Sequence, residues 1–147
     1  WLRNLHEEMQ VTTVIVTHDQ EEAMEVADQI VVINHGKVEQ VGTAAEIYDH
    51  PATPFVMNFV GEVNRFPSPE AEIFVRPHHL ELLEDPTAGS VPAVVHRITH
   101  LGKDLIAELV LDNGEHLNAH LPRDQHQLAT LERGSRLHVQ PRASHQF

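Results

Sequence analysis

The sequence predicts an α/β segment followed by a small all-β domain, and three observations support this division. Residues 11–16 form an uninterrupted run rich in β-branched side chains, which is typical of a strand covered on both faces in a parallel sheet. Residues 62–72 contain Pro and Ser and predict a connector. From Ile73 onward, short alternating runs predict the strands of a small barrel or sandwich. We therefore predict domains at residues 1–61 and 62–147.

The composition excludes several classes of protein. The chain has 147 residues and a formal net charge of -12, with 10 Lys and Arg against 22 Asp and Glu. Nucleic-acid binding needs clustered basic side chains, so we expect no nucleic-acid partner. No apolar run approaches the ~20 residues of a membrane span, and no signal peptide opens the chain. The absence of Cys excludes disulfides and thiolate metal sites, which is consistent with a cytoplasmic protein.

The first domain begins with a predicted helix over residues 1–10, where apolar side chains recur at helical spacing. After the strand, Asp19 and Glu22 have the spacing of a capping box, which opens a second helix. The runs IVVIN and KVEQVG predict two strands joined by a tight turn at His35-Gly36.

Two short helices complete the first domain. Thr43 with Glu46 forms another capping box, and the helix that it opens ends near His50. Pro54 begins the last helix, because Pro suits the first helical position.

Strands dominate the second domain. The run Asp112-Asn113-Gly114 between two alternating segments is a strong signal for a β-hairpin. The predicted strands are residues 72–77, 90–102, 104–115, 116–122 and 136–142.

His18 stands where the predicted strand at residues 11–16 ends and the next helix begins. On physical grounds alone an ordinary polar turn is the favoured interpretation, because such turns are common. However, ligands of open α/β sheets bind beyond the carboxyl ends of the strands, and His18 lies there. An imidazole at this point could donate a hydrogen bond to a phosphate oxygen or position a water beside it.

The 13 His residues raise the question of a metal site. His96 and His100 have the i, i+4 spacing that binds zinc on a helix, and His116 and His120 repeat it. Both pairs lie in predicted strands. At ~3.3 Å per residue, such partners are roughly 13 Å apart, too far to share one ion. We therefore expect no metal site.

The sequence offers little for anion recognition. Arg76, Arg97 and Arg142 are the basic residues of the second domain that we considered, and each is interpreted as a surface charge. No loop of the GxxxxGK[ST] type, which cradles phosphates, occurs anywhere in the sequence.

Residues 13–61, TVIVTHDQEEAMEVADQIVVINHGKVEQVGTAAEIYDHPATPFVMNFVG, closely resemble the end of the ATPase subunit of import-type ABC transporters. In that family the strand-His-Asp-x-x-Glu-Ala arrangement is the switch region, or H-loop. By this resemblance His18 matches the switch histidine that contacts the γ-phosphate, and Asp19 matches the residue after it. The resemblance also implies ATP and Mg²⁺ as cofactors of the complete subunit.

Other motifs of that family are absent from the sequence. It has no Walker A, Q-loop, LSGGQ-like signature or Walker B with its catalytic glutamate, all of which precede the H-loop in the family. The resemblance therefore implies the C-terminal part of a P-loop ABC ATPase domain. We expect this chain by itself to bind neither ATP nor Mg²⁺ tightly and to lack ATPase activity.

Residues 62–147 resemble the regulatory β domain, OB-like and often called TOBE, of importer ATPases for sulfate, molybdate and maltose. FVRPHHLEL matches a recurring Val-Arg-Pro-His segment, while FVGEVNR, HRITHLGKDLIAEL and DNGEHLNAHL are most similar to the sulfate/thiosulfate importers. The interval from Asn64 to Phe74 is shorter than in the family, which predicts a lost early strand and an open barrel.

The resemblance implies an ATP-hydrolysing subunit that couples ATP hydrolysis to sulfate or thiosulfate uptake. Such a subunit forms a homodimer, binds transmembrane permease subunits and lies at the cytoplasmic face of the inner or plasma membrane. A second interpretation is a free-standing regulatory module, without ATPase activity, whose β domain binds an oxyanion. A third, a His-rich metal-binding protein, is disfavoured by the strand spacing above.

Overall fold

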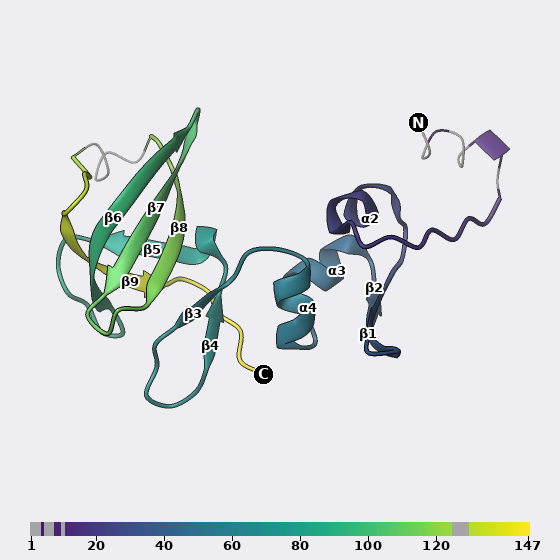
Figure 1. Cartoon of the computed structure of the whole chain (residues 1–147), viewed down its shortest axis with the longest axis horizontal. Helices are drawn as coiled ribbons and strands as arrows, with labels where there is room; N and C mark the ends of the chain where they lie inside the picture. The colour runs from purple at the N-terminus through teal and green to yellow at the C-terminus, as the bar shows by residue number, and fades with distance from the viewer. Residues whose placement is uncertain (1–3, 5–7, 10, 125–129) are drawn as a thin grey trace. The chain divides into compact units, whose positions relative to one another are not determined.

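The computed structural model describes residues 4, 8, 9, 11–124 and 130–147. The chain divides into two compact units, Trp1–Gly61 and Glu62–Gln146. Figure 1 shows short helices and a hairpin in the first unit and a larger sheet in the second. Within the described residues, no helix is both long and apolar enough to cross a membrane.

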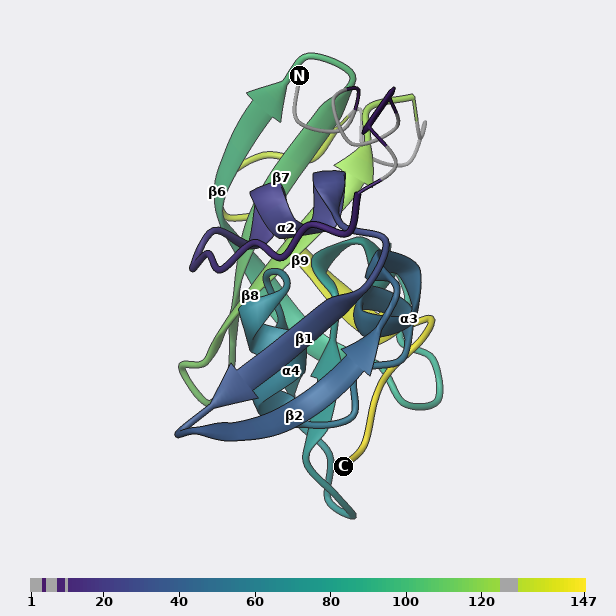
Figure 2. The same cartoon turned by 90° about the vertical axis from the view of Figure 1, so that its right-hand side faces the viewer.

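The first unit contains the predicted hairpin, formed by the antiparallel strands β1 (Ile30–Asn34) and β2 (Lys37–Gly42) (Figure 2). In the turn between them φ is 48° at His35 and 74° at Gly36. A type I′ hairpin turn requires this left-handed conformation at both central positions, and Gly adopts it without a steric penalty.

Three short helices of the first unit begin at side-chain caps. They are α2 (Gln20–Val26), α3 (Ala44–Asp49) and α4 (Pro54–Phe59). The side chains of Asp19, Thr43 and Thr53 each accept a hydrogen bond from a backbone N–H of the first turn. At α3 the predicted capping box is complete, because Glu46 Oε2 accepts from the Thr43 N–H at 2.8 Å. The small core of this unit consists of Val32, Ile47, Val56 and Val60.

The predicted strand at residues 11–16 is not formed, and the described part of the first unit contains no parallel sheet. Val14 and Val16 are 85% and 94% exposed. A strand needs neighbours for its backbone N–H and C=O groups, whereas β1 and β2 pair only with each other. The predicted parallel sheet of residues 1–61 is therefore not formed among the described residues, whereas the three helices and the hairpin are. The predicted helix over residues 1–10 falls mostly outside them.

A five-stranded antiparallel sheet dominates the second unit, in the order β5-β9-β6-β7-β8. Its strands are β5 (Leu80–Leu83), β6 (Val91–Leu101), β7 (Asp104–Leu111), β8 (His116–Pro122) and β9 (Arg136–Pro141). Alternate side chains point into one core along β7 and β8. The turn that joins these strands has φ of 86° at Gly114, so the predicted hairpin is confirmed.

The segment that was predicted to be only a connector forms part of a short hairpin. In it β3 (Asn64–Phe66) pairs with β4 (Ile73–Val75), and the 3₁₀-helix η1 (Pro77–His79) then leads into β5. A strand of three residues is too short to show alternation in the sequence. Among the described strands no ladder joins β5 to β8, so the sheet keeps two edges. Both β3 and η1 lie against β8.

Candidate functional site

His18 lies in the turn that leads into α2, and its side chain is exposed. Asp19 Oδ1 accepts a hydrogen bond from the Glu22 N–H at 3.1 Å. The Asp19 N–H in turn donates to Thr17 Oγ1 at 2.9 Å. These contacts fix the backbone next to His18 and leave its imidazole at the surface, where it could meet a ligand.

The described residues around His18 do not form a nucleotide pocket by themselves. Two cavities lie in the second unit, and His18 lines neither of them. No three His, Cys, Asp or Glu side chains in the described ranges are grouped so that they could hold a metal ion. The described residues therefore do not fit a Mg²⁺ site. The assignment of His18 and Asp19 to a nucleotide site stays a prediction.

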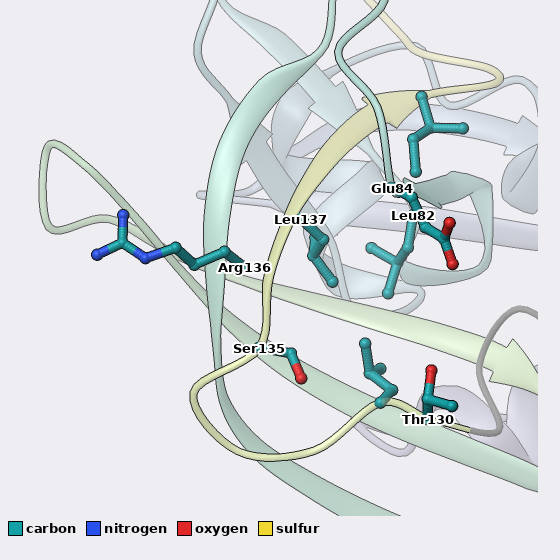
Figure 3. Close-up of a pocket in the computed structure, with 8 residues that line it drawn as sticks. Leu82, Glu84, Thr130, Ser135, Arg136 and Leu137 are labelled. Atoms are coloured by element: carbon teal, nitrogen blue, oxygen red, sulfur yellow. The ribbon is translucent and has the colours of Figure 1, made fainter.

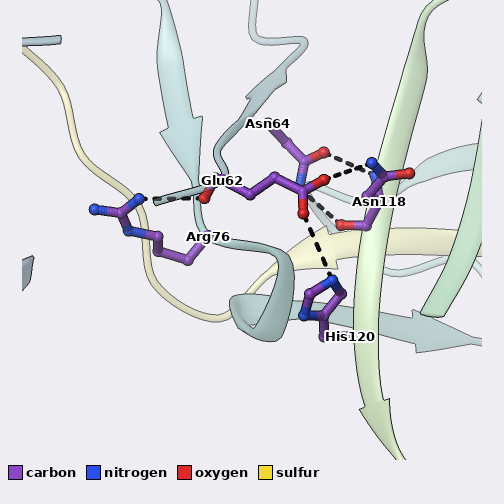
Figure 4. Close-up of polar contacts among 5 residues, drawn as sticks. All are labelled: Glu62, Asn64, Arg76, Asn118 and His120. Atoms are coloured by element: carbon purple, nitrogen blue, oxygen red, sulfur yellow. Dashed lines mark hydrogen bonds and ion pairs between the residues drawn. The ribbon is translucent and has the colours of Figure 1, made fainter. Parts of the chain in front are cut away.

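In the second unit, polar side chains converge on Glu62, the first residue of that unit (Figure 4). Asn118 Nδ2 donates to Glu62 Oε1 at 2.5 Å, and His120 Nε2 lies 3.7 Å from Glu62 Oε2. Arg76 donates from Nη1 to the backbone carbonyl of Glu62 at 3.2 Å. The start of this unit is therefore held by Asn118 and His120 of β8 and by Arg76.

Asn64 ties β3 to the edge strand β8. Its side chain is buried, and its amide makes two hydrogen bonds with the Asn118 backbone. Oδ1 accepts from the N–H and Nδ2 donates to the C=O, both at 2.8 Å. This side chain thus supplies the paired bonds that a neighbouring strand would make, at an edge with which no described strand forms a ladder. Sequence reasoning missed it, because no local pattern signals a partner 54 residues away.

Arg76 is only 1% exposed, which corrects its interpretation as a surface charge. Taking a charge out of water costs several kcal/mol, so a buried guanidinium needs hydrogen-bond acceptors. The carbonyl oxygen of Glu62 is one of them. In the segment Val75-Arg76-Pro77 the Arg side chain therefore joins the end of β4 to the start of the unit.

Basic side chains gather around η1 and form what we call the η1 basic cluster: Arg76, His78, His79, His120 and Arg142. Arg142 donates from Nη2 to the His78 carbonyl and from its backbone N–H to the His79 carbonyl, each at 2.8 Å. The rings of His78 and His79 lie 4.2 Å apart, centre to centre. Burial lowers the pKa of His78, and the positive fields of the other cluster members lower it further. The interpretation of Arg142 as a surface charge alone is thus incomplete.

A small cavity of about 150 Å³ lies beside β5 and β9 (Figure 3). Leu82, Leu131 and Leu137 supply much of its aliphatic lining. The Arg136 side chain points away from the other labelled residues in Figure 3. Small-molecule sites usually measure about 300–1,000 Å³ and contain converging polar groups. This cavity is therefore a weak candidate for a binding site.

Comparisons with known proteins connect both units to one family. Residues 85–142 match the family model described as a TOBE-like domain. The sulfate/thiosulfate import ATP-binding protein CysA of Synechococcus elongatus is 54% identical over 100% of this chain and 46% of that protein. The protein of the same name from Thermosynechococcus vestitus is 50% identical over 100% of this chain and 47% of its own length. Along its whole length the chain is therefore similar to about half of each of these sulfate/thiosulfate import ATP-binding proteins.

A relative of lower identity also matches the whole chain. CysA of Burkholderia pseudomallei is 41% identical over 100% of this chain and 49% of that protein. The chain spans about half the length of the curated relatives it matches. A solved structure of the cytoplasmic molybdate-binding protein ModG covers 50% of this chain and 58% of that chain, with 15% identity and a TM-score of 0.42. That likeness is too low to establish a shared fold.

Proposed function

We propose that this chain is part of the ATP-binding subunit of a sulfate/thiosulfate-type ABC importer, which couples ATP hydrolysis to solute uptake. The observation that carries the proposal is 54% identity to an import ATP-binding protein along 100% of this chain. The TOBE-like match at residues 85–142 supports it, since the resemblance places such a domain after the ATPase part of importer subunits.

In this function His18 contacts the γ-phosphate as the switch histidine. The hydrogen bonds of Asp19 hold the turn on one side of the imidazole, so the ring is presented from a fixed backbone. A ring N–H can then donate to a phosphate oxygen on which negative charge must be stabilised as the phosphoryl group leaves. A phosphate loop and Mg²⁺ ligands must come from other parts of the complete protein, because the described residues fit neither.

The partners follow from the same proposal. The complete subunit would pair with a second copy of itself and with transmembrane permease subunits. It would lie peripherally at the cytoplasmic face of the membrane. The exposed apolar side chains at Val14 and Val16 support an interface in this region, since large exposed apolar patches mark protein contacts.

The test is His18→Ala in a full-length protein that contains this sequence. Losing one preorganised donor costs roughly a hundred- to a thousandfold in rate, so ATP hydrolysis and sulfate uptake should nearly disappear. ATP affinity should change little, because the phosphate loop makes most of the ground-state contacts. His50→Ala, at the exposed end of α3, is the matched control and should keep normal turnover. Near-normal hydrolysis by His18→Ala would reduce His18 to a turn residue.

The η1 basic cluster favours a second candidate function, oxyanion binding by the β unit. One member of the cluster, His120, lies 3.7 Å from the carboxylate of Glu62, an anionic group, in a chain whose net charge is -12. Titration of the chain with sulfate and with molybdate tests this candidate. Saturable binding at micromolar concentration that is lost in Arg142→Ala would support it. Heat changes indistinguishable from those with sodium chloride would exclude it.

A further inference from the structure

The structure brings together two His residues that sequence reasoning considered only in separate pairs. His96 lies on β6 and His116 begins β8, and their rings are 6.0 Å apart between centres with an interplanar angle of 80°. Neither residue takes part in the function proposed above. Both side chains are exposed, so water and ions reach them.

The local strand geometry explains this pairing. β7 lies between β6 and β8, and Val110 on β7 is opposite Val94 on one side and His116 on the other. The register of β6 shifts between Val95 and Arg97, which leaves His96 as the extra residue of a β-bulge. A bulge turns a side chain away from the regular alternation of the strand. Here the bulged imidazole lies across β7 from its partner on β8.

The separation of the two rings fits chelation of one metal ion. An imidazole nitrogen binds zinc at about 2.0–2.1 Å, which puts the ring centre about 3.2 Å from the metal. Two such ring centres are about 5.2 Å apart at a tetrahedral angle and about 6.4 Å apart in a linear arrangement. The observed 6.0 Å lies within this range. In contrast, the pairs along one strand are roughly 13 Å apart and cannot share an ion.

We propose that His96 and His116 bind a divalent late first-row transition-metal ion in a solvent-open site that crosses β7. Imidazole is a preferred ligand of Zn²⁺, Ni²⁺ and Cu²⁺, and Cu²⁺ should bind most tightly. In the described ranges no third His, Cys, Asp or Glu completes a metal-binding group, so water occupies the remaining positions. The net charge of -12 raises the local concentration of cations near the surface. A bound ion would link β6 to β8.

The experiment is a Zn²⁺ titration of the whole chain, followed through the imidazole signals of ¹⁵N-labelled His in NMR spectra. The chain has 13 His residues, so weak background binding is expected and the order of response is decisive. The signals of His96 and His116 should shift together, at lower Zn²⁺ than those of His100. First responses elsewhere, or shifts of only one of the two, would overturn the proposal.

Affinity measurements with Cu²⁺ give a second readout. His96→Ala and His116→Ala should each weaken the tightest site roughly a hundredfold, because the second ligand of a pair acts at high effective concentration. His100→Ala, on the same strand as His96 and also exposed, is the matched control and should bind as the wild type does. Circular dichroism checks that all variants fold. Equal affinity in wild type and His96→Ala would show that the ring contact is only an edge-to-face pair.

Discussion

Asn64→Ala should destabilise the second unit, because it removes both hydrogen bonds between this side chain and the Asn118 backbone. A buried hydrogen bond contributes a net of about 1 kcal/mol, and a polar group left unpaired costs about 1–3 kcal/mol. The lost partners lie at a sheet edge, where water can replace part of the contact. We therefore expect a loss of about 2–3 kcal/mol in the free energy of unfolding.

The assay combines urea unfolding, followed by far-UV circular dichroism, with hydrogen exchange at the Asn118 amide. That amide should exchange faster in Asn64→Ala, because its acceptor, Asn64 Oδ1, is gone. Asn64→Asp keeps an acceptor for the N–H, so exchange at Asn118 should stay slower than in Asn64→Ala. Its buried carboxylate faces the Asn118 C=O, so the loss of stability should be at least as large. Arg65→Ala is the control. Its ion pair with Glu72 is exposed, and its loss should cost less than about 1 kcal/mol.

Two results together would refute this reasoning. One is an unfolding free energy of Asn64→Ala within about 0.5 kcal/mol of the wild type, the usual range for surface substitutions. The other is unchanged exchange at Asn118. Together they would mean that the backbone of β8 stays protected at Asn118 without the side chain of Asn64.

The other predictions concern the caps, the charges and the isolated chain. Thr43→Ala should cost the first unit about 1 kcal/mol in thermal melts, because α3 loses its N-cap. Hydrogen bonds from Thr43 lower the pKa of Glu46 below 4.5, so the ionised carboxylate stabilises the fold above pH 4.5 and this stabilisation is lost as the pH falls through the lowered pKa. Glu46→Gln should therefore reduce the loss of stability at acid pH, and an unchanged loss would contradict the prediction. The pKa of His78 is lowered below 6.5, so below pH 6.5 the unfolded state binds a proton at His78 more readily than the folded state does, and the free energy of unfolding falls. His78→Gln should reduce this fall in thermal melts measured across that pH range. The purified chain should show no Mg²⁺-dependent ATP turnover and should self-associate through residues 11–16, which phosphate-release assays and sedimentation will check.

Local chemistry decided the parts of this protein that its sequence predicted. The caps at Asp19 and Thr43 and the turn at His35-Gly36 depend on atoms within three or four residues, and the structure contains all of them. Most strands of the second unit were predicted for a related reason, since alternation over seven or more residues is readable along the chain. The family resemblance was confirmed by relatives that match 100% of the chain.

Long-range pairing decided the rest. The run at residues 11–16 has the composition of a buried strand but no described neighbour, and a strand forms only when its backbone groups find partners. Arg76 is buried, although an Arg in an alternating run gives no sign of the carbonyl that receives it. Asn64 meets Asn118 across 54 residues, and a one-residue bulge brings His96 to within 6.0 Å of His116 between ring centres. Sequence spacing sets which neighbours can interact within one element, whereas contacts between elements depend on strand order and register, which only the folded chain determines.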